Sequence, residues 1–135
     1  MRDTEIVIYL KKILGKYLRE EGIYVFSKQN VLTLPQITVS IGPIESDVYG
    51  FTMYRGPKLF FFYNTQDVDV YVDILTAPSP SDTFVPIKSG IRVPSGEAKV
   101  AVTNGSTAFN YLKFRYSTLM PSSKGYIKTI VVRWS

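Results

Sequence analysis

The sequence of 135 residues contains neither cysteine nor histidine. Without cysteine there are no disulfides, no thiolate nucleophiles and no zinc sites built on thiolates. Without histidine there is no imidazole for proton transfer, for a Ser-His-Asp arrangement or for the common transition-metal sites. These two absences exclude much of the catalytic and metal chemistry known in small proteins. We therefore expect no catalytic residues, no cofactor and a protein that is not an enzyme.

The sequence also lacks a long apolar run. No stretch of about 18 apolar residues occurs, and lysines interrupt the apolar N-terminal segment, so neither a transmembrane span nor a cleavable signal peptide is expected. The phosphate-binding glycine patterns GxGxxG and GxxxxGK are missing as well. The length suits one domain, and 45% apolar residues with ten tyrosines and eight phenylalanines indicate a folded chain rich in strands.

Helical periodicity is confined to the first 22 residues. In RDTEIVIYLKKILGKYLREEG, apolar residues fall on one side and lysines on the other, and Gly22 can end the helix. We expect an amphipathic helix that forms an arm at residues 1–22, in front of a β-sandwich domain at residues 23–135. The arm either packs on the sandwich or reaches a neighbouring molecule. Its apolar stripe consists of Ile6, Leu10, Ile13, Leu14 and Tyr17.

After Gly22 the apolar period changes to two. Short runs of β-branched and aromatic residues, such as KLFFFY and VDVYVDIL, alternate with turn signals such as YRGPK and VPSGE. Seven to nine such runs, at intervals of roughly ten residues, predict a mainly β protein with an antiparallel β-sandwich or jelly roll. The longest irregular piece, TAPSPSDTFVP, contains three prolines and is expected to cross from one sheet to the other.

Three aspartates lie in the run NTQDVDVYVDIL. Because strand side chains alternate, Asp67, Asp69 and Asp73 face one side while the valines face the core. The three carboxylates are a candidate calcium site, but alternate side chains lie about 6.6 to 7 Å apart, too far to share one ion without a bulge or a facing loop. A glycosidase pair would need a pocket that raises one pKa, and none is indicated. The preferred interpretation is a solvated face, or one that meets a base such as Arg115.

A second candidate surface is the run FNYLKFRYS. Phe109, Tyr111, Lys113 and Arg115 share one face of this strand. Aromatic rings beside cations suit single-stranded nucleic acid, and the net charge of +5 favours an anionic partner. The same pattern also occurs where Lys and Arg simply lie across exposed rings. Exposed tyrosines and Trp134 could stack on sugar rings, so a carbohydrate-binding module remains an alternative.

The layout of the whole chain resembles a group of viral proteins. An arm, EIVIYLKKILGKYLREEG, precedes short strands that close in GYIKTIVVRWS. This layout is similar to small jelly-roll or β-sandwich virion proteins, such as the decoration and minor capsid proteins of tailed phages and of viruses of thermophiles. The resemblance implies a homo-oligomer, in the virion or the host cytoplasm, that binds copies of itself or a capsid or tail protein.

We therefore expect a non-enzymatic structural and interaction protein. The alternative is a β-sandwich module that binds carbohydrate or single-stranded nucleic acid. The resemblance carries over no catalytic or ligand residue. The expected partner-binding residues are the apolar stripe of the arm and the face that contains Phe109, Tyr111, Lys113 and Arg115.

Overall fold

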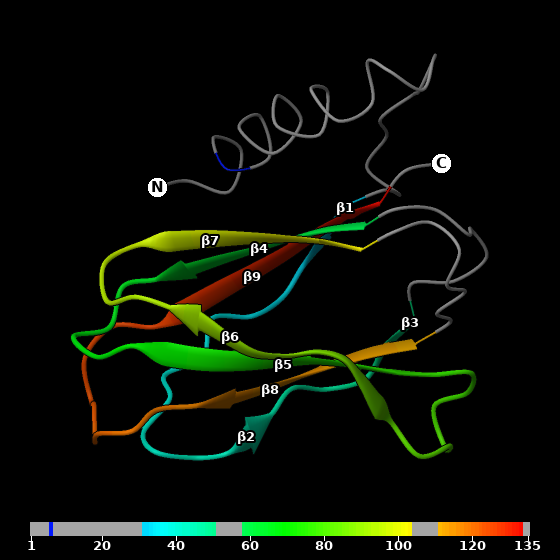
Figure 1. The fold of residues 1–135 in the computed structure, drawn as a ribbon, viewed down its shortest axis with the longest axis horizontal. Coiled ribbons are helices and arrows are strands. Elements are labelled where there is room, and N and C mark those ends of the chain that lie inside the picture. The colour runs from blue at the N-terminus through cyan, green and yellow to red at the C-terminus, as the bar shows by residue number, and fades with distance from the viewer. Residues whose placement is uncertain (1–5, 7–30, 51–57, 104–110, 134–135) are drawn as a thin grey trace.

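Nine β-strands form two antiparallel sheets in the computed structural model, which describes residues 6, 31–50, 58–103 and 111–133 (Figure 1). Sheet A has the strand order β1-β9-β4-β7, and sheet B has the order β2-β8-β5-β6, with β3 also paired to β8. The strands are β1 (Val31–Thr33), β2 (Ile44–Glu45), β3 (Tyr49–Gly50), β4 (Lys58–Asn64), β5 (Val70–Ala77), β6 (Val85–Val93), β7 (Ala98–Thr103), β8 (Tyr111–Ser117) and β9 (Ile127–Arg133). The predicted mainly β fold of seven to nine strands is confirmed.

The chain changes sheet at most of its connections. It passes from β4 in sheet A to β5 in sheet B, from β6 back to β7, and from β8 to β9. Strands that are distant in sequence therefore become neighbours, such as β1 with β9 and β2 with β8. This order is that of a jelly roll, in which two sheets share one core. The structure thus selects the jelly roll from the two arrangements that the sequence predicts.

The segment TAPSPSDTFVP does not cross between the sheets, so that prediction is wrong. β5 and β6 are adjacent antiparallel strands of sheet B, with Val70 opposite Val93 and Thr76 opposite Val85. The loop between them only reverses the chain. The start of β6 could not be predicted from the sequence pattern, because it contains Pro86 and proline is rare inside sheets. Pro86 is accommodated because β6 is an edge strand. On its outer side there is no further described strand that would need the missing N–H as a donor.

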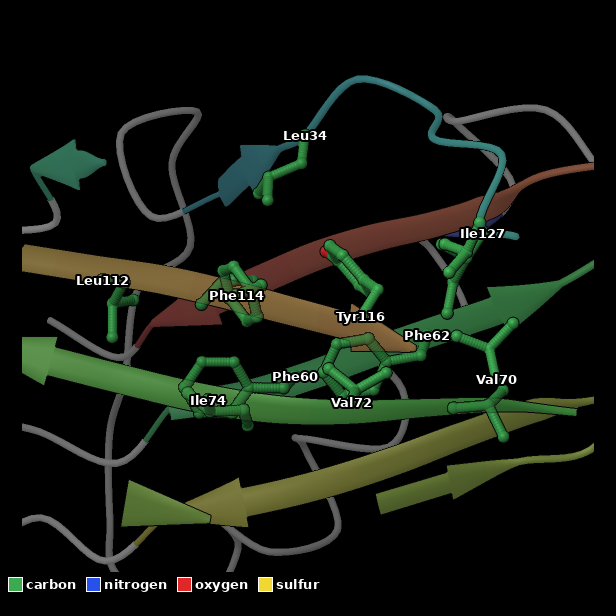
Figure 2. Packing of buried hydrophobic residues seen from close by; sticks show 13 residues of the cluster. Leu34, Phe60, Phe62, Val70, Val72, Ile74, Leu112, Phe114, Tyr116 and Ile127 are labelled. Atoms are coloured by element: carbon green, nitrogen blue, oxygen red, sulfur yellow. The ribbon is translucent and has the colours of Figure 1, made fainter. Parts of the chain in front are cut away.

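The main core lies between the two sheets and is centred on aromatic rings (Figure 2). The Phe114 ring centroid lies 6.0 Å from that of Phe60 and 6.1 Å from that of Phe62, both in edge-to-face geometry. The hydroxyls of Tyr116 and Thr129 share a hydrogen bond of 2.7 Å, and burial raises the pKa of Tyr116. The predicted inward residues of β5 are buried: Val70, Val72 and Ile74.

Sheet A is buried on its outer face as well. A second apolar cluster, whose members are at most 1% exposed, lies on that face. It consists of Ile6, Leu59, Phe61, Ile130 and Val132. Ile6 therefore packs on the sandwich of its own chain. The rest of the predicted stripe, Leu10, Ile13, Leu14 and Tyr17, lies outside the described residues, as does the boundary at residue 22, so the helical arm stays a prediction. No helix in the described part of the chain is long and apolar enough to cross a membrane.

Candidate functional site

The outer face of sheet B carries paired charges. Tyr111, Lys113 and Arg115 of β8 face outward, as the alternation predicts. Lys113 Nζ lies 2.9 Å from a carboxylate oxygen of Glu45, and Arg115 lies 3.6 Å from Glu45 and 3.9 Å from Asp73. The hydrogen bond from Lys113 is the main cause that lowers the pKa of Glu45. The contact between Asp73 and Arg115 is the one that the sequence predicts.

These contacts weaken the case for nucleic acid at β8. Lys113 Nζ also lies 4.7 Å from the ring centre of Phe84, so a carboxylate and an aromatic ring already contact its charge. A phosphate would have to compete with Glu45 for this ammonium group. Phe109, the fourth residue of the predicted surface, lies outside the described residues. In the described part of this face, Lys113 and Arg115 are therefore already paired with carboxylates of sheet B.

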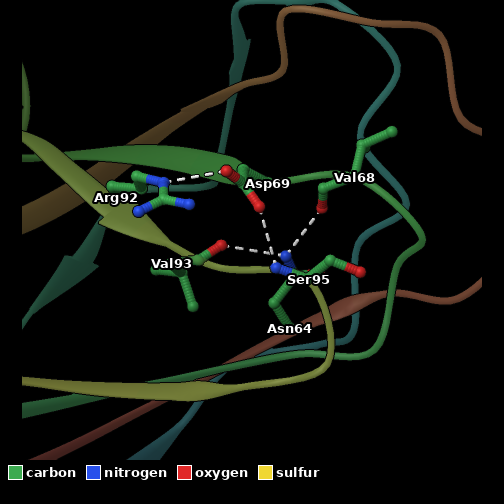
Figure 3. A network of polar contacts seen from close by, with 6 residues as sticks. All are labelled: Asn64, Val68, Asp69, Arg92, Val93 and Ser95. Atoms are coloured by element: carbon green, nitrogen blue, oxygen red, sulfur yellow. Dashed lines mark hydrogen bonds and ion pairs between the residues drawn. The ribbon is translucent and has the colours of Figure 1, made fainter.

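The predicted aspartates do not converge on one point. Asp69 accepts hydrogen bonds from Arg92 Nε at 2.8 Å and from the Ser95 backbone N–H at 3.0 Å (Figure 3). Asp73 accepts one from the Gly90 N–H at 2.8 Å. The described residues contain no group of three side chains of the types that hold a metal ion. Each carboxylate thus stabilises its own part of sheet B and the adjoining loops.

Asp69 makes the stability of the fold depend on pH. The Ser95 N–H and then the Arg92 guanidinium hold the pKa of Asp69 below its ordinary value of 3.8. A carboxylate with a depressed pKa in the folded state stabilises the protein above the unfolded-state pKa, and this contribution disappears as the pH falls through the folded-state pKa. We expect Asp69→Asn to flatten the decline of unfolding free energy below about pH 4, measured by urea denaturation. Arg92→Gln should flatten it in part, and parallel profiles for all three proteins would contradict the assignment.

Hydrogen bonds join four connections at one end of the sandwich, on the left of Figure 1. They are the β1–β2, β4–β5, β6–β7 and β8–β9 connections. Gln66, which is 1% exposed, accepts from the Val39 N–H and donates to the Val39 carbonyl, both at 2.9 Å, as a strand neighbour would. Ser95 Oγ donates to the Gln66 carbonyl at 2.6 Å. Gly125 has φ +78°, and a Cβ there would lie 2.5 Å from the Thr65 carbonyl oxygen. The connections at this end are therefore closely packed and held together by hydrogen bonds.

A hollow of about 280 Å³ opens at this end. Leu119 is 81% exposed and Met120 63%, the highest values among the large apolar side chains that the structure describes. Asp67 Oδ1 accepts a hydrogen bond of 2.7 Å from the Ser122 hydroxyl. The hollow is lined by Asp67, Val68, Asp69, Tyr71, Leu119 and Met120.

The backbone next to the exposed pair, Leu119 and Met120, is held by hydrogen bonds. The Thr118 hydroxyl accepts from the Ile41 N–H at 2.6 Å and donates to the Met120 carbonyl at 2.9 Å, and the Thr118 N–H donates to the Ile41 carbonyl at 2.8 Å. Ile41 has φ +64°, rare for a β-branched residue, and is 51% exposed. The sequence singled out Asp67 and Asp69 of this site but not Leu119 and Met120, because TLMPSSKG has the composition of a turn and only its Leu-Met pair is unusual there.

The β7 edge of sheet A is another candidate surface, because an edge strand has unpaired backbone groups. The Asn64 N–H donates to the Glu97 carbonyl at 3.0 Å, and the β4–β7 register then assigns the odd-numbered residues of β7 to bonds with β4. The backbone groups of Ala98, Val100 and Val102 point the other way. No described strand pairs with β7 on that side.

Comparisons with known proteins support the fold alone. No protein-family model and no curated protein matches the sequence. The solved structure "Crystal structure of PirA" is similar with a TM-score of 0.50 and 15% identity, over 84% of this chain and 100% of that chain. "CBM4 structure and function" has a TM-score of 0.40 and 12% identity over 86% and 83% of the two chains, and the Anabaena sensory rhodopsin transducer has 0.34 and 11% over 80% and 97%. The likeness to PirA supports a small β-rich fold.

Proposed function

We propose that this protein is a non-enzymatic structural protein that self-associates through the β7 edge of sheet A. The observation that carries the proposal is the row of backbone N–H and C=O groups that Ala98, Val100 and Val102 direct away from β4. Such an edge is a template for a strand of another chain. A second copy of the same strand is the occupant that we propose.

The edge strands β6 and β7 differ in how they resist such pairing. β6, at the edge of sheet B, carries Pro86 and Lys88 and has register shifts along its pairing with β5. Prolines, charges and irregular register are the features that keep edge strands apart. β7 pairs with β4 in an unbroken register from Ala98 to Thr103, and Lys99 is its one charged residue. The β7 edge therefore lacks the protection that β6 has.

Two-fold symmetry allows several antiparallel registers for two β7 strands, and the register that we propose is centred on Val100. With Val100 opposite its own symmetry mate, Ala98 lies opposite Val102, and these outward-bonding residues face one another across the ladder. Lys99 then lies opposite Ala101. In the register centred on Lys99, two lysines would face each other, which is destabilising. The charge of Lys99 thus favours the register centred on Val100 over the one centred on Lys99.

The pairing would also join the apolar outer faces of the two sheets A. Val100 and Val102 pack against the second apolar cluster and are only half-buried. Across the two-fold axis these side chains would meet those of the second copy on the same face, which buries further apolar area. Among the predicted contact residues that the structure describes, Ile6 is buried, and Lys113 and Arg115 are paired within sheet B. A role in a virion, as the resemblance implies, agrees with self-association and stays a prediction.

Single cysteines test the register, since the chain has no cysteine of its own. Val100→Cys should form a covalent dimer on mild oxidation, because paired residues have Cα atoms about 5.5 Å apart, within disulfide range. Ala98→Cys and Val102→Cys are matched controls, and each should stay uncrosslinked because its own mate lies about 13 Å along the strand. The double variant of Ala98 and Val102 should cross-link again. Equal cross-linking of the three single variants would contradict the register.

Light scattering over a series of protein concentrations tests the association itself. Val100→Pro should abolish it with little loss of stability, because this N–H points away from β4. Lys99→Pro, whose N–H points toward β4, should lower the melting temperature more. A parent protein that is monomeric at every concentration would overturn the proposal.

A further inference from the structure

We infer that the hollow at the end of the sandwich binds a neutral, hydroxyl-rich ligand of the saccharide class. The hollow is formed by the residues that precede and begin β5 and by the β8–β9 connection. The proposed self-association uses β7, at the edge of the other sheet. The two sites therefore share no residue, and either can fail without the other.

The charges around the hollow favour a neutral ligand. Asp67 and Asp69 line it, and Arg92, which is paired with Asp69, has a side chain that is 59% exposed. Arg92 Nε makes the contact with Asp69, and the two terminal nitrogens of the guanidinium group take no part in this hydrogen bond (Figure 3). An anion would meet two carboxylates, and Arg92 already compensates the charge of Asp69, which reduces the attraction for a cation. A hydroxyl group can donate a hydrogen bond to either carboxylate without bringing a charge of its own into the hollow.

The polar groups of the hollow are held in place before any ligand arrives. The Ser95 N–H fixes one oxygen of Asp69 while Arg92 fixes the other. The Ser122 hydroxyl holds Asp67 Oδ1 at 2.7 Å. A few fixed polar groups among apolar walls are typical of small-molecule sites, because little conformational freedom is lost on binding.

The apolar lining offers a surface for the C–H face of a sugar ring. Leu119 and Met120 are exposed in this lining, and half-buried Tyr71 adds an aromatic ring and a hydroxyl to it. Covering Leu119 and Met120 would remove apolar area from water, which favours binding. The volume of about 280 Å³ lies near the lower end of ligand sites, so a single sugar unit suits it better than a long buried chain.

The test follows the methyl NMR signals of Leu119 and Met120 in the full chain. Cellohexaose, mannohexaose and the hexamer of N-acetylglucosamine are the neutral probes, and spermidine and inorganic phosphate are the charged ones. We expect at least one neutral probe to shift both methyl signals saturably, and neither charged probe to do so. Absence of a saturable shift with all three saccharides, or a stronger response to spermidine or phosphate, would overturn the inference.

Variants then assign the binding to the hollow. The double variant Leu119→Ala and Met120→Ala should weaken saccharide binding by about tenfold or more, followed by the Tyr71 ring signals. Val85→Ala is the matched control, since Val85 is 54% exposed on β6 and does not line the hollow, and it should bind as the parent does. Asp67→Asn keeps an oxygen acceptor and removes the charge, so binding should fall by less than about tenfold. Equal weakening by Val85→Ala would overturn the assignment.

Discussion

Phe114→Ala is expected to lower the free energy of unfolding by about 3 to 5 kcal/mol. The Phe114 side chain is fully buried, meets Phe60 and Phe62 edge-to-face, and stacks on Tyr116 with ring centroids 6.4 Å apart. Alanine would leave a cavity where the two sheets meet, and the strands around it can relax only in part. A domain of this size is stable by about 5 to 15 kcal/mol, so this loss is a large fraction of the total.

Urea denaturation followed by circular dichroism measures this loss. Phe84→Ala is the matched control, because it makes the same change in a half-exposed ring that contacts Lys113. Its loss should be below about 1 kcal/mol, the usual size of an exposed contact between a cation and a ring. Similar losses in the two variants would contradict the central position of Phe114 in the core.

Gln66→Leu should destabilise the protein by about 2 to 6 kcal/mol. The Gln66 side chain bonds both backbone groups of Val39, at 2.9 Å each, and both residues are buried. Leucine has a similar volume but leaves a buried N–H and a buried C=O without these partners. Each unsatisfied buried group costs about 1 to 3 kcal/mol. The β1–β2 connection would then lose its main tie to the β4–β5 connection.

Gln36→Leu is the control for this change, because Gln36 is exposed on the same connection as Val39. Its unfolding free energy in urea should differ from that of the parent by less than about 0.5 kcal/mol. In Gln66→Leu, hydrogen exchange at the Val39 amide should be faster than in the parent. An unchanged exchange rate at Val39 would show that Gln66 does not hold this backbone.

The fold class and the faces of the strands could be predicted from sequence because they depend on local alternation. On β8, residues Leu112 and Phe114 are buried, and Lys113 and Arg115 face outward, as the pattern predicts. Successive side chains point to opposite faces whatever the neighbouring strands are. The start of β6 could not be predicted in the same way, because whether Pro86 is tolerated depends on the position of the strand in its sheet.

The sequence by itself determined that this chain is a mainly β protein without cysteine or histidine chemistry, because composition and period-two patterns are properties of short segments. Only the tertiary structure decided the strand order, the edge position of β7 and the hollow. Asp67 meets Ser122, and Ile41 meets Thr118, across more than fifty residues of chain. Contacts at such separations are set by the packing of whole sheets, and no local pattern encodes them.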